Sequence, residues 1–249
     1  MDLKIKAAFT EKYSRLLPGA ELPVTFYFTD NPGEIPLSPA LDEEDWKCFI
    51  CQLGRVRNGQ PTAFGLRAIG CSGAKRALGF EQEIRPNFEY FLSCGLAGHI
   101  EGIRYKKTPA LVKAIQEAQP AYEAPARYAV FKRWDGLEAE DEPTAVIFFA
   151  APDKLSALFS LVNFDEPTPF GVIAPSCAGC SSIVYYPYHE AQKPDPKAVL
   201  GMFDISARPC VHPNILTLAV PYARFERLAA NMDESFLIAE QWNKIRDRI

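Results

Sequence analysis

The sequence predicts an α/β or α+β protein made of two similar strand–helix–strand halves. Strand-like runs of β-branched and aromatic residues alternate with segments of helical periodicity. A phrase that begins at Pro61 recurs in similar form at Pro167. A length of 249 residues, 48% of them hydrophobic and 23% charged, suits one large domain or two smaller ones. We expect a first half over residues 1–135 and a second over 144–249, packed together as one compact unit.

The first half contains strand, helix and turn signals in alternation. The expected elements are a strand over 22–29, a helix over 42–57, a strand over 63–69, a helix that starts after Gly73, a helix over 109–119 and a strand over 127–134. The helix over 42–57 rests on an apolar stripe at i, i+3, i+4 and i+7. That stripe consists of Trp46, Phe49, Ile50, Leu53 and Val56. Thr108 and Pro109 form a favourable N-cap and first-turn pair for the later helix.

An acidic, turn-rich connection over 135–143 is the best candidate for the boundary between the halves.

The second half repeats the order of elements. The expected elements are a strand over 145–150, a helix over 152–164, strands over 170–174 and 215–221, and helices over 222–231 and 234–249. Asp233 is expected to cap the last helix.

Two phrases, PTAFGLRAIGCSGA (61–74) and PTPFGVIAPSCAGC (167–180), align without a gap and are identical at seven of fourteen positions. About one identity is expected by chance at ordinary composition. We interpret the pair as an internal repeat with a pseudo-twofold axis, in which the two cysteine turns face each other across a cleft. The alternative is coincidence between two Pro-Thr strand entries.

Composition and missing motifs exclude several function classes. The net charge of −4 gives no basic field for nucleic acid or an anionic membrane. The N-terminal segment lacks an apolar signal region, and no run of about 18 apolar residues predicts a membrane span. We therefore expect a cytoplasmic protein whose seven cysteines are kept reduced. Phosphate-binding loops, dinucleotide fingerprints and nucleophile elbows are also missing from the sequence.

The pair Cys48 and Cys51 lies opposite the apolar stripe if the segment is helical, beside Arg55. Two thiolates at this spacing can share one metal ion or one iron–sulfur cluster, and a nearby arginine favours the thiolate form. The alternative is a helix packed on both sides, with the cysteines acting as small hydrophobic residues.

Each repeated phrase ends in a glycine-containing cysteine turn, which could bind a cofactor or a small anion. In the alternative interpretation, the small residues of the turns only permit tight packing. The predicted cofactor-binding residues are Cys71, Gly73, Lys75, Arg76, Gly179 and Cys180. The predicted metal ligands are Cys48, Cys51, Cys71, Cys177 and Cys180. The three histidines, His99, His189 and His212, follow no short metal-binding spacing and are expected in loops or at the surface.

Several stretches together resemble a prokaryotic family known as domain of unknown function 169. They are Cys51…Gly59…Cys71-x-Gly73-Ala74…Leu78-Gly79-Phe80, Glu101-Gly102-x-Arg104-Tyr105…Pro109, Ala178-Gly179-Cys180-Ser181-Ser182, Phe203–Arg208 and the closing VPYARF…NMDESFL…W. The resemblance runs from about Leu22 to Ile249. It implies no reaction, substrate or cofactor, because the family is uncharacterised. Cys51, Cys71 and Cys180 lie within the resembling stretches, whereas the other four, Cys48, Cys94, Cys177 and Cys210, do not match the family pattern.

Three functions remain open from the sequence. The leading hypothesis is a cysteine-lined cofactor site between the halves, holding an iron–sulfur cluster or zinc in a redox role with a redox partner. The second is a non-enzymatic module that binds a small anionic ligand at the two turns beside Lys75 and Arg76. The third is a transferase or hydrolase with Cys71 or Cys180 as nucleophile. Whether the protein is an enzyme is left open.

Overall fold

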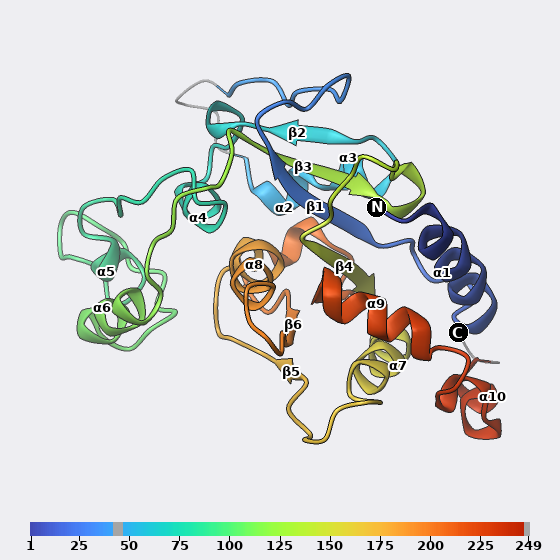
Figure 1. Cartoon of the computed structure of the whole chain (residues 1–249). Coiled ribbons are helices and arrows are strands. Elements are labelled where there is room, and N and C mark those ends of the chain that lie inside the picture. The colour runs from blue at the N-terminus through green and yellow to red at the C-terminus, as the bar shows by residue number, and fades with distance from the viewer. Residues whose placement is uncertain (42–46, 247–249) are drawn as a thin grey trace.

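The computed structural model describes residues 1–41 and 47–246, and over these residues it forms a seven-stranded mixed sheet (Figure 1). The strand order is β2-β3-β1-β4-β7-β6-β5. The strands are β1 (Val24–Thr29), β2 (Thr62–Phe64), β3 (Tyr128–Arg133), β4 (Ala145–Ala150), β5 (Val172–Ile173), β6 (Ala198–Gly201) and β7 (Leu216–Pro221). Neighbouring strands are antiparallel except β5 and β6, which are parallel. Both predicted halves contribute to this sheet, because β1 pairs with β3 on one side and β4 on the other.

Strand β4 lies at the centre of the sheet and is buried along its whole length. Its side chains alternate between two cores: Ile147 and Phe149 enter one, and Val146 and Phe148 enter the other. Alternation of this kind follows from the twofold repeat of a strand. The sheet therefore separates two packed layers, each with its own hydrophobic core.

One layer, which we call the aromatic face, is covered by long helices. They are α1 (Leu3–Leu16), α7 (Pro152–Val162), α9 (Tyr222–Asn231) and the shorter α10 (Glu240–Arg246). Phe9 of α1 packs its ring against Trp134, Phe148 and Phe225, with centroid distances between 4.8 and 6.3 Å. Aromatic side chains bury large areas in such edge-on arrangements, so this face forms a densely packed core.

The other layer, which we call the cysteine face, is covered by short helical segments. They are α2 (Phe49–Gln52), α3 (Gly54–Arg57), α4 (Ser72–Ala77), a π-helical turn (Ser181–Tyr185) and α8 (Tyr186–Glu190). The apolar side chains of these segments pack on the sheet face that contains Ile147 and Phe149. Much of the remaining cover on this side consists of loops.

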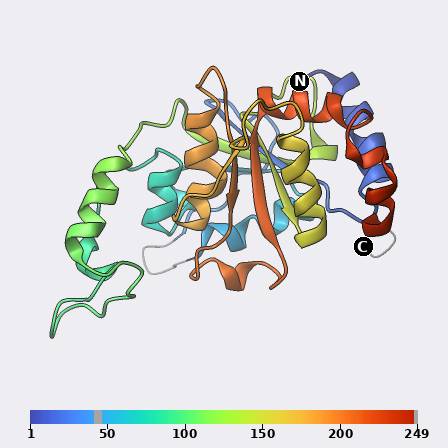
Figure 2. The same cartoon turned by 90° about the horizontal axis from the view of Figure 1, so that it is seen from below.

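An arm over residues 80–126 stands apart from the sheet in both views (Figures 1 and 2). It contains α5 (Phe88–Phe91) and α6 (Pro109–Ala118). The base of the arm is fixed by the guanidinium of Arg76, which donates to the carbonyls of Gln82 and Gln119. Its far loop returns to the body, where the Tyr105 hydroxyl is 2.7 Å from that of Ser206.

The structure does not show the predicted pseudo-twofold repeat. In the first phrase, Thr62–Phe64 forms β2, an antiparallel strand at one edge of the sheet. In the second, only Val172–Ile173 forms a strand, β5, which is parallel and lies at the opposite edge. The expected strand over 63–69 ends early because the backbone enters a 3-10 turn at Leu66–Ala68. The two phrases therefore have similar sequences and different structures.

Two predicted helices are interrupted. The segment 42–57 forms α2 and α3, which meet at Leu53, while residues 42–46, including Trp46, lie outside the described residues. The segment 234–249 forms a 3-10 turn at Phe236–Ile238 and then α10. Asp233 caps neither; it forms ion pairs with Lys12 and Arg15 of α1. The turn is instead capped by the hydroxyl of Ser235.

Elements with a strong local pattern were predicted correctly. These are β1, β3, β4, β7, α6, α7 and α9, whose bounds differ from the predictions by two residues or fewer. The Thr108 side chain accepts from the Leu111 backbone N–H, which confirms the predicted N-cap of α6. Helix α1 and strand β6 were not predicted.

Candidate metal and thiol centre

The cysteine pair 48 and 51 lies at the start of α2, with Cys48 at the N-cap position. Phe49 and Ile50 between them are almost fully buried against the sheet. The apolar side of α2 faces inward, Cys51 is exposed, and Cys48 is partly buried and packs against the edge of the core. The expected position opposite the apolar stripe therefore holds for Cys51 but not for Cys48, and the helix is much shorter than expected.

A third cysteine, Cys210, approaches this pair from the loop 202–215 that joins β6 to β7. The three sulfur atoms all lie within 4.8 Å of one another. Cys51 and Cys210 form a disulfide across a sequence separation of 159 residues, and Cys48 is a free thiol beside it. Cys210 was not among the predicted metal ligands. No local sequence signal identifies it, because it belongs to neither CxxC pair.

The loop 202–215 is organised by its own side chains. The Arg208 guanidinium donates to the backbone carbonyls of Met202, His212, Pro213 and Ile215. One arginine therefore ties both ends of the loop together, two residues before Cys210. This arrangement fixes the shape of the loop that carries Cys210, independently of the disulfide.

Two side chains join this loop to the second cysteine turn. The Asp204 carboxylate accepts from the backbone N–H groups of Ser206 and Gly179, each at 3.0 Å. The buried Ser182 hydroxyl donates to the Gly179 carbonyl at 2.7 Å and accepts from the Met202 N–H at 3.4 Å. A Cβ at Gly179 would lie 2.9 Å from that of Ala207, so glycine allows the turn and loop to touch. Gly179 therefore serves packing between two protein segments.

A second group of thiols lies behind the first. Cys180 is 6% exposed and belongs to the core of the cysteine face, against which Cys48, Cys71 and Cys210 also pack. Burial raises the pKa of the Cys180 thiol well above its usual value, and negative charge on Cys71 and on Asp204 raises it further. Negative charge on Cys177 or on Cys48 also raises the pKa of the Cys180 thiol. Cys71 and Cys48 therefore pack against the core that contains Cys180, but among the described residues only Cys48, Cys51 and Cys210 form a cluster of three sulfur atoms within 4.8 Å of one another.

Burial also raises the pKa of the Cys177 thiol to about 12, with a contribution from Asp204. At neutral pH, Cys177 and Cys180 are therefore protonated, unless a cation arrives to stabilise their thiolates. Helix α4, which follows Cys71, contacts the π-helical turn that follows Cys180. The two cysteine turns of the repeated phrase are thus neighbours, although their backbones are not equivalent.

The remaining predicted residues have different surroundings. The Arg76 guanidinium is engaged at the base of the arm, and a Cβ at Gly73 would meet only the Cys71 sulfur at 3.7 Å, an ordinary contact. Lys75 is partly buried in α4. Helix α4 has only six residues. The geometry gives little support to an anion site built from these cations.

No histidine joins the sulfur group within residues 1–41 and 47–246. His189 lies against the rings of Tyr122 and Tyr185, with centroids 5.0 and 4.4 Å away. His212 accepts from the Asn214 backbone through Nδ1. Cys94 is exposed on the arm and does not belong to the group. The candidate centre therefore has an all-sulfur donor set.

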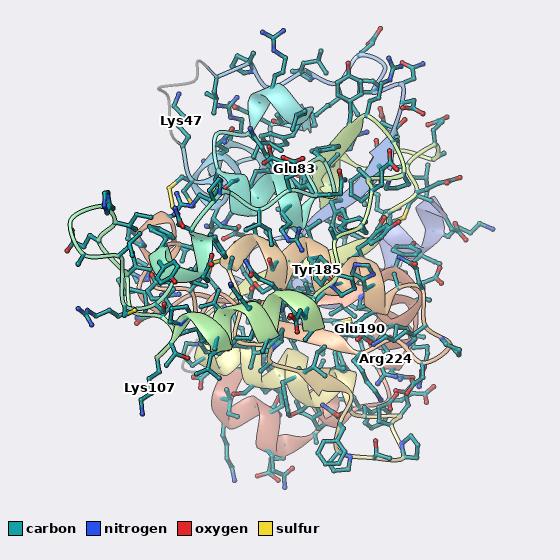
Figure 3. All side chains as sticks on the ribbon, turned by 90° about the vertical axis from the view of Figure 1, so that its left-hand side faces the viewer. Lys47, Glu83, Lys107, Tyr185, Glu190 and Arg224 are labelled. Carbon is teal, nitrogen blue, oxygen red and sulfur yellow. A yellow bond between two sulfur atoms is a disulfide. The ribbon has the colours of Figure 1, made fainter. Side chains whose placement is uncertain are left out.

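Figure 3 views the molecule from the side of the arm. Lys47, the residue before Cys48, projects from the rim of the molecule in this view, and Tyr185 of the π-helical turn lies nearer its middle. Cys51 is exposed, so solutes can reach the centre from solvent.

A family model described as uncharacterised ArCR (DUF169) matches residues 15–231. The chain belongs to this family. The match confirms the resemblance drawn from the sequence, and it includes all seven cysteines. Neither the curated proteins nor the solved structures that were searched contain a match to the chain. Among the described residues, no helix combines the length and apolarity that a bilayer crossing requires.

Proposed function

We propose that this DUF169 protein binds a soft metal at a redox-active thiolate centre formed by Cys48, Cys51 and Cys210. The observation that carries the proposal is the convergence of these three sulfur atoms within 4.8 Å, two from α2 and its N-cap and one from a distant loop. Three soft ligands in one place favour zinc, copper(I) or an iron–sulfur cluster over magnesium or calcium.

The buried thiols behind the triad supply a candidate fourth ligand. Cys180 packs in the same core cluster as Cys48 and Cys210, and its charged neighbours all disfavour its thiolate. A metal cation at the centre would favour the thiolate form of Cys180 over the thiol, because a cation stabilises a coordinated thiolate directly. Structural zinc takes four ligands, from cysteine or histidine, and a cubane iron–sulfur cluster takes four cysteines. Because no histidine joins the group among the described residues, a fourth sulfur would complete either site.

The Cys51–Cys210 disulfide is the oxidised, metal-free form in this proposal. Reduction by a dithiol transfers two electrons, breaks the S–S bond and yields two thiols, which can then release protons to the solvent and bind the metal. Such a centre operates where thiols remain reduced, which favours the cytoplasm. Its ligands come from residues 1–135 and 144–249, so the metal would join the two predicted halves.

The proposal is tested by purifying the protein without oxygen in the presence of a dithiol, then measuring metal content and the visible spectrum. An iron–sulfur cluster predicts a brown protein with about four irons per chain. A zinc centre predicts a colourless protein with one zinc per chain, as a four-ligand site requires. A bound iron–sulfur cluster would support electron transfer at the centre, because its iron changes oxidation state. Bound zinc would not, because zinc has no redox chemistry.

Single variants assign the ligands. Cys48→Ser, Cys51→Ser and Cys210→Ser are expected to lose most of the metal, and Cys180→Ser is expected to weaken its retention. Cys94→Ser is the matched control, because Cys94 is exposed on the arm and lies outside the triad. If the reduced wild type binds none of iron, zinc and copper(I) when each is supplied, or if Cys94→Ser loses metal like the triad variants, the proposal is wrong.

A further inference from the structure

We propose that Cys48 exchanges with the adjacent disulfide, moving it from Cys51–Cys210 to Cys48–Cys51. This inference concerns the oxidised form of the same centre and rests on the proposed function only in sharing its three cysteines. Thiol–disulfide exchange is an internal reaction of the chain and requires no bound metal.

The geometry provides both the attacking group and the target. Cys48 is a free thiol, and its sulfur lies within 4.8 Å of both sulfurs of the disulfide. Exchange proceeds when a thiolate attacks one sulfur of a disulfide and displaces the other. Exchange requires a change of the Cys48 side-chain torsion that brings its sulfur closer to the disulfide, and no capping hydrogen bond holds this side chain in place.

The product is compatible with the local backbone. Cys48 is the N-cap and Cys51 the third residue of α2, so the two residues are three apart at the start of a helix. Residues three apart on a helix lie on neighbouring positions of its surface, at about 5–6 Å between Cβ atoms. A small adjustment of the first turn brings them to disulfide distance, which is about 3.5–4.5 Å between Cβ atoms.

Atoms and electrons balance within the chain. The Cys48 thiol loses its proton to solvent, and its sulfur forms a bond to the Cys51 sulfur. The Cys51–Cys210 bond breaks, its electron pair leaves on the Cys210 sulfur, and that thiolate takes up a proton from solvent. The number of disulfides is unchanged, so neither an oxidant nor a reductant is consumed.

Exchange changes which parts of the fold are joined. In the Cys51–Cys210 form, α2 is covalently bound to the loop 202–215. In the Cys48–Cys51 form the bond is local, and the loop is held only by non-covalent contacts, including the hydrogen bonds of Arg208, Asp204 and Ser182. Because Ser206 of the same loop contacts Tyr105 of the arm, the exchange would also alter how firmly the arm is attached.

An alkylation experiment on the oxidised, metal-free full chain tests the exchange. Iodoacetamide traps any cysteine that becomes a free thiol, and peptide mapping identifies it. In the wild type, Cys210 is expected to be alkylated progressively without any reductant, because exchange through Cys48 releases it. In Cys48→Ser, Cys210 is expected to remain protected, with a labelling rate at least about tenfold lower, since no neighbouring thiolate can displace it.

Cys48→Ala provides a second variant in case serine disturbs the partly buried position, and Cys94→Ser provides a matched control that should label Cys210 like the wild type. Circular dichroism verifies that each variant is folded. Equal labelling of Cys210 in the wild type and both Cys48 variants would overturn the inference.

The outcome is separate from the test of metal binding, which uses reduced protein. If Cys210 is trapped through Cys48 but the reduced protein binds no metal, the exchange stands and the metal centre fails. If metal binds but Cys210 stays protected in the oxidised wild type, the metal centre stands and the exchange fails.

Discussion

The aromatic face and the cysteine face of the sheet are stabilised in different ways. The aromatic face is covered by long helices whose large rings pack around Phe9, Trp134 and Phe225. The cysteine face is covered by helices of six residues or fewer and by a loop fixed through backbone hydrogen bonds to Arg208 and Asp204. Burial stabilises both faces, since each has its own hydrophobic core, but the cysteine face also brings three sulfur atoms together near solvent. A change on the aromatic face should therefore affect stability, whereas a change on the cysteine face should affect both stability and thiol chemistry.

The largest effect is expected from Arg224→Met on the aromatic face. The Arg224 and Glu166 side chains are 1% and 3% exposed and form an ion pair. Removing the cation takes away the nearest partner of the Glu166 carboxylate, so that only Arg227 at 3.4 Å and Lys197 at 3.7 Å still pair with it, and it leaves the Val162 carbonyl without the Arg224 donor. We expect this to lower the free energy of unfolding by about 3–5 kcal/mol. Urea denaturation measures this change. Arg127→Ala is the control, because the Arg127–Asp30 pair is largely exposed; a similar loss in both variants would contradict the comparison.

The disulfide should have the next largest effect, on the cysteine face. A crosslink across 159 residues restricts the unfolded chain, so Cys210→Ser should be less stable than the oxidised wild type by about 2–4 kcal/mol. Denaturation with and without a dithiol measures the difference, which should nearly vanish once the wild type is reduced. If the reduced wild type is as stable as the oxidised one, the disulfide does not stabilise the fold.

These two expectations illustrate what local sequence does and does not encode. Strand β4 and helices α7 and α9 could be predicted because their apolar residues follow one clear period. Helix α1 was missed because only Phe9, Tyr13 and Leu16 of its fourteen residues are buried, which leaves a weak stripe. Strand β6 was missed because four residues give too short a pattern.

The candidate site was predicted only in part for a related reason. The exposure of Cys51 follows from the stripe of α2, which is a local property, whereas the contact of Cys48 with the core does not. Cys210 reaches them through a tertiary contact between distant segments, and nothing within its own segment specifies that contact. Arg208 and Asp204, which position the loop, are likewise recognisable only from the carbonyl and N–H groups that surround them in the folded chain.

Asp204→Ala tests whether the loop depends on polar contacts. The substitution removes the acceptor for the Gly179 and Ser206 N–H groups, which should cost about 1–2 kcal/mol of unfolding free energy. It should also speed the loss of metal to a chelator, since the loop that holds Cys210 is loosened. Asp204→Asn keeps one acceptor oxygen. Its unfolding free energy and its rate of metal loss are expected to lie between those of the wild type and of Asp204→Ala. Unchanged metal retention in both variants would show that the Asp204 contacts are not needed to hold the loop.

The smallest effect is expected from Asp233 at the rim of the aromatic face. Hydrogen bonds from Lys12 and then Arg15 lower the pKa of this carboxyl. A lowered pKa stabilises the fold above the unfolded pKa of about 3.9, and the contribution is lost as pH falls through the folded value. Asp233 is 41% exposed, so solvent screening should keep the effect below about 1 kcal/mol.

Urea denaturation of the wild type and Asp233→Asn at about pH 7 and about pH 2 measures this contribution. At the higher pH the wild type should be more stable than Asp233→Asn. At the lower pH the two proteins should have equal free energies of unfolding. A difference that persists in acid would mean that the carboxylate charge is not its source.

The position of β1 between β3 and β4 has a consequence for how the chain folds during synthesis. Val24–Thr29 leaves the ribosome early, yet both of its partners, β3 and β4, lie more than about a hundred residues further along. Until they emerge, an apolar strand with two unpaired edges is exposed, and such a segment is prone to aggregate or to bind chaperones. Pairing over long sequence separations is also slow. The nascent chain therefore passes through a vulnerable interval that ends only when β3 and β4 have enclosed β1.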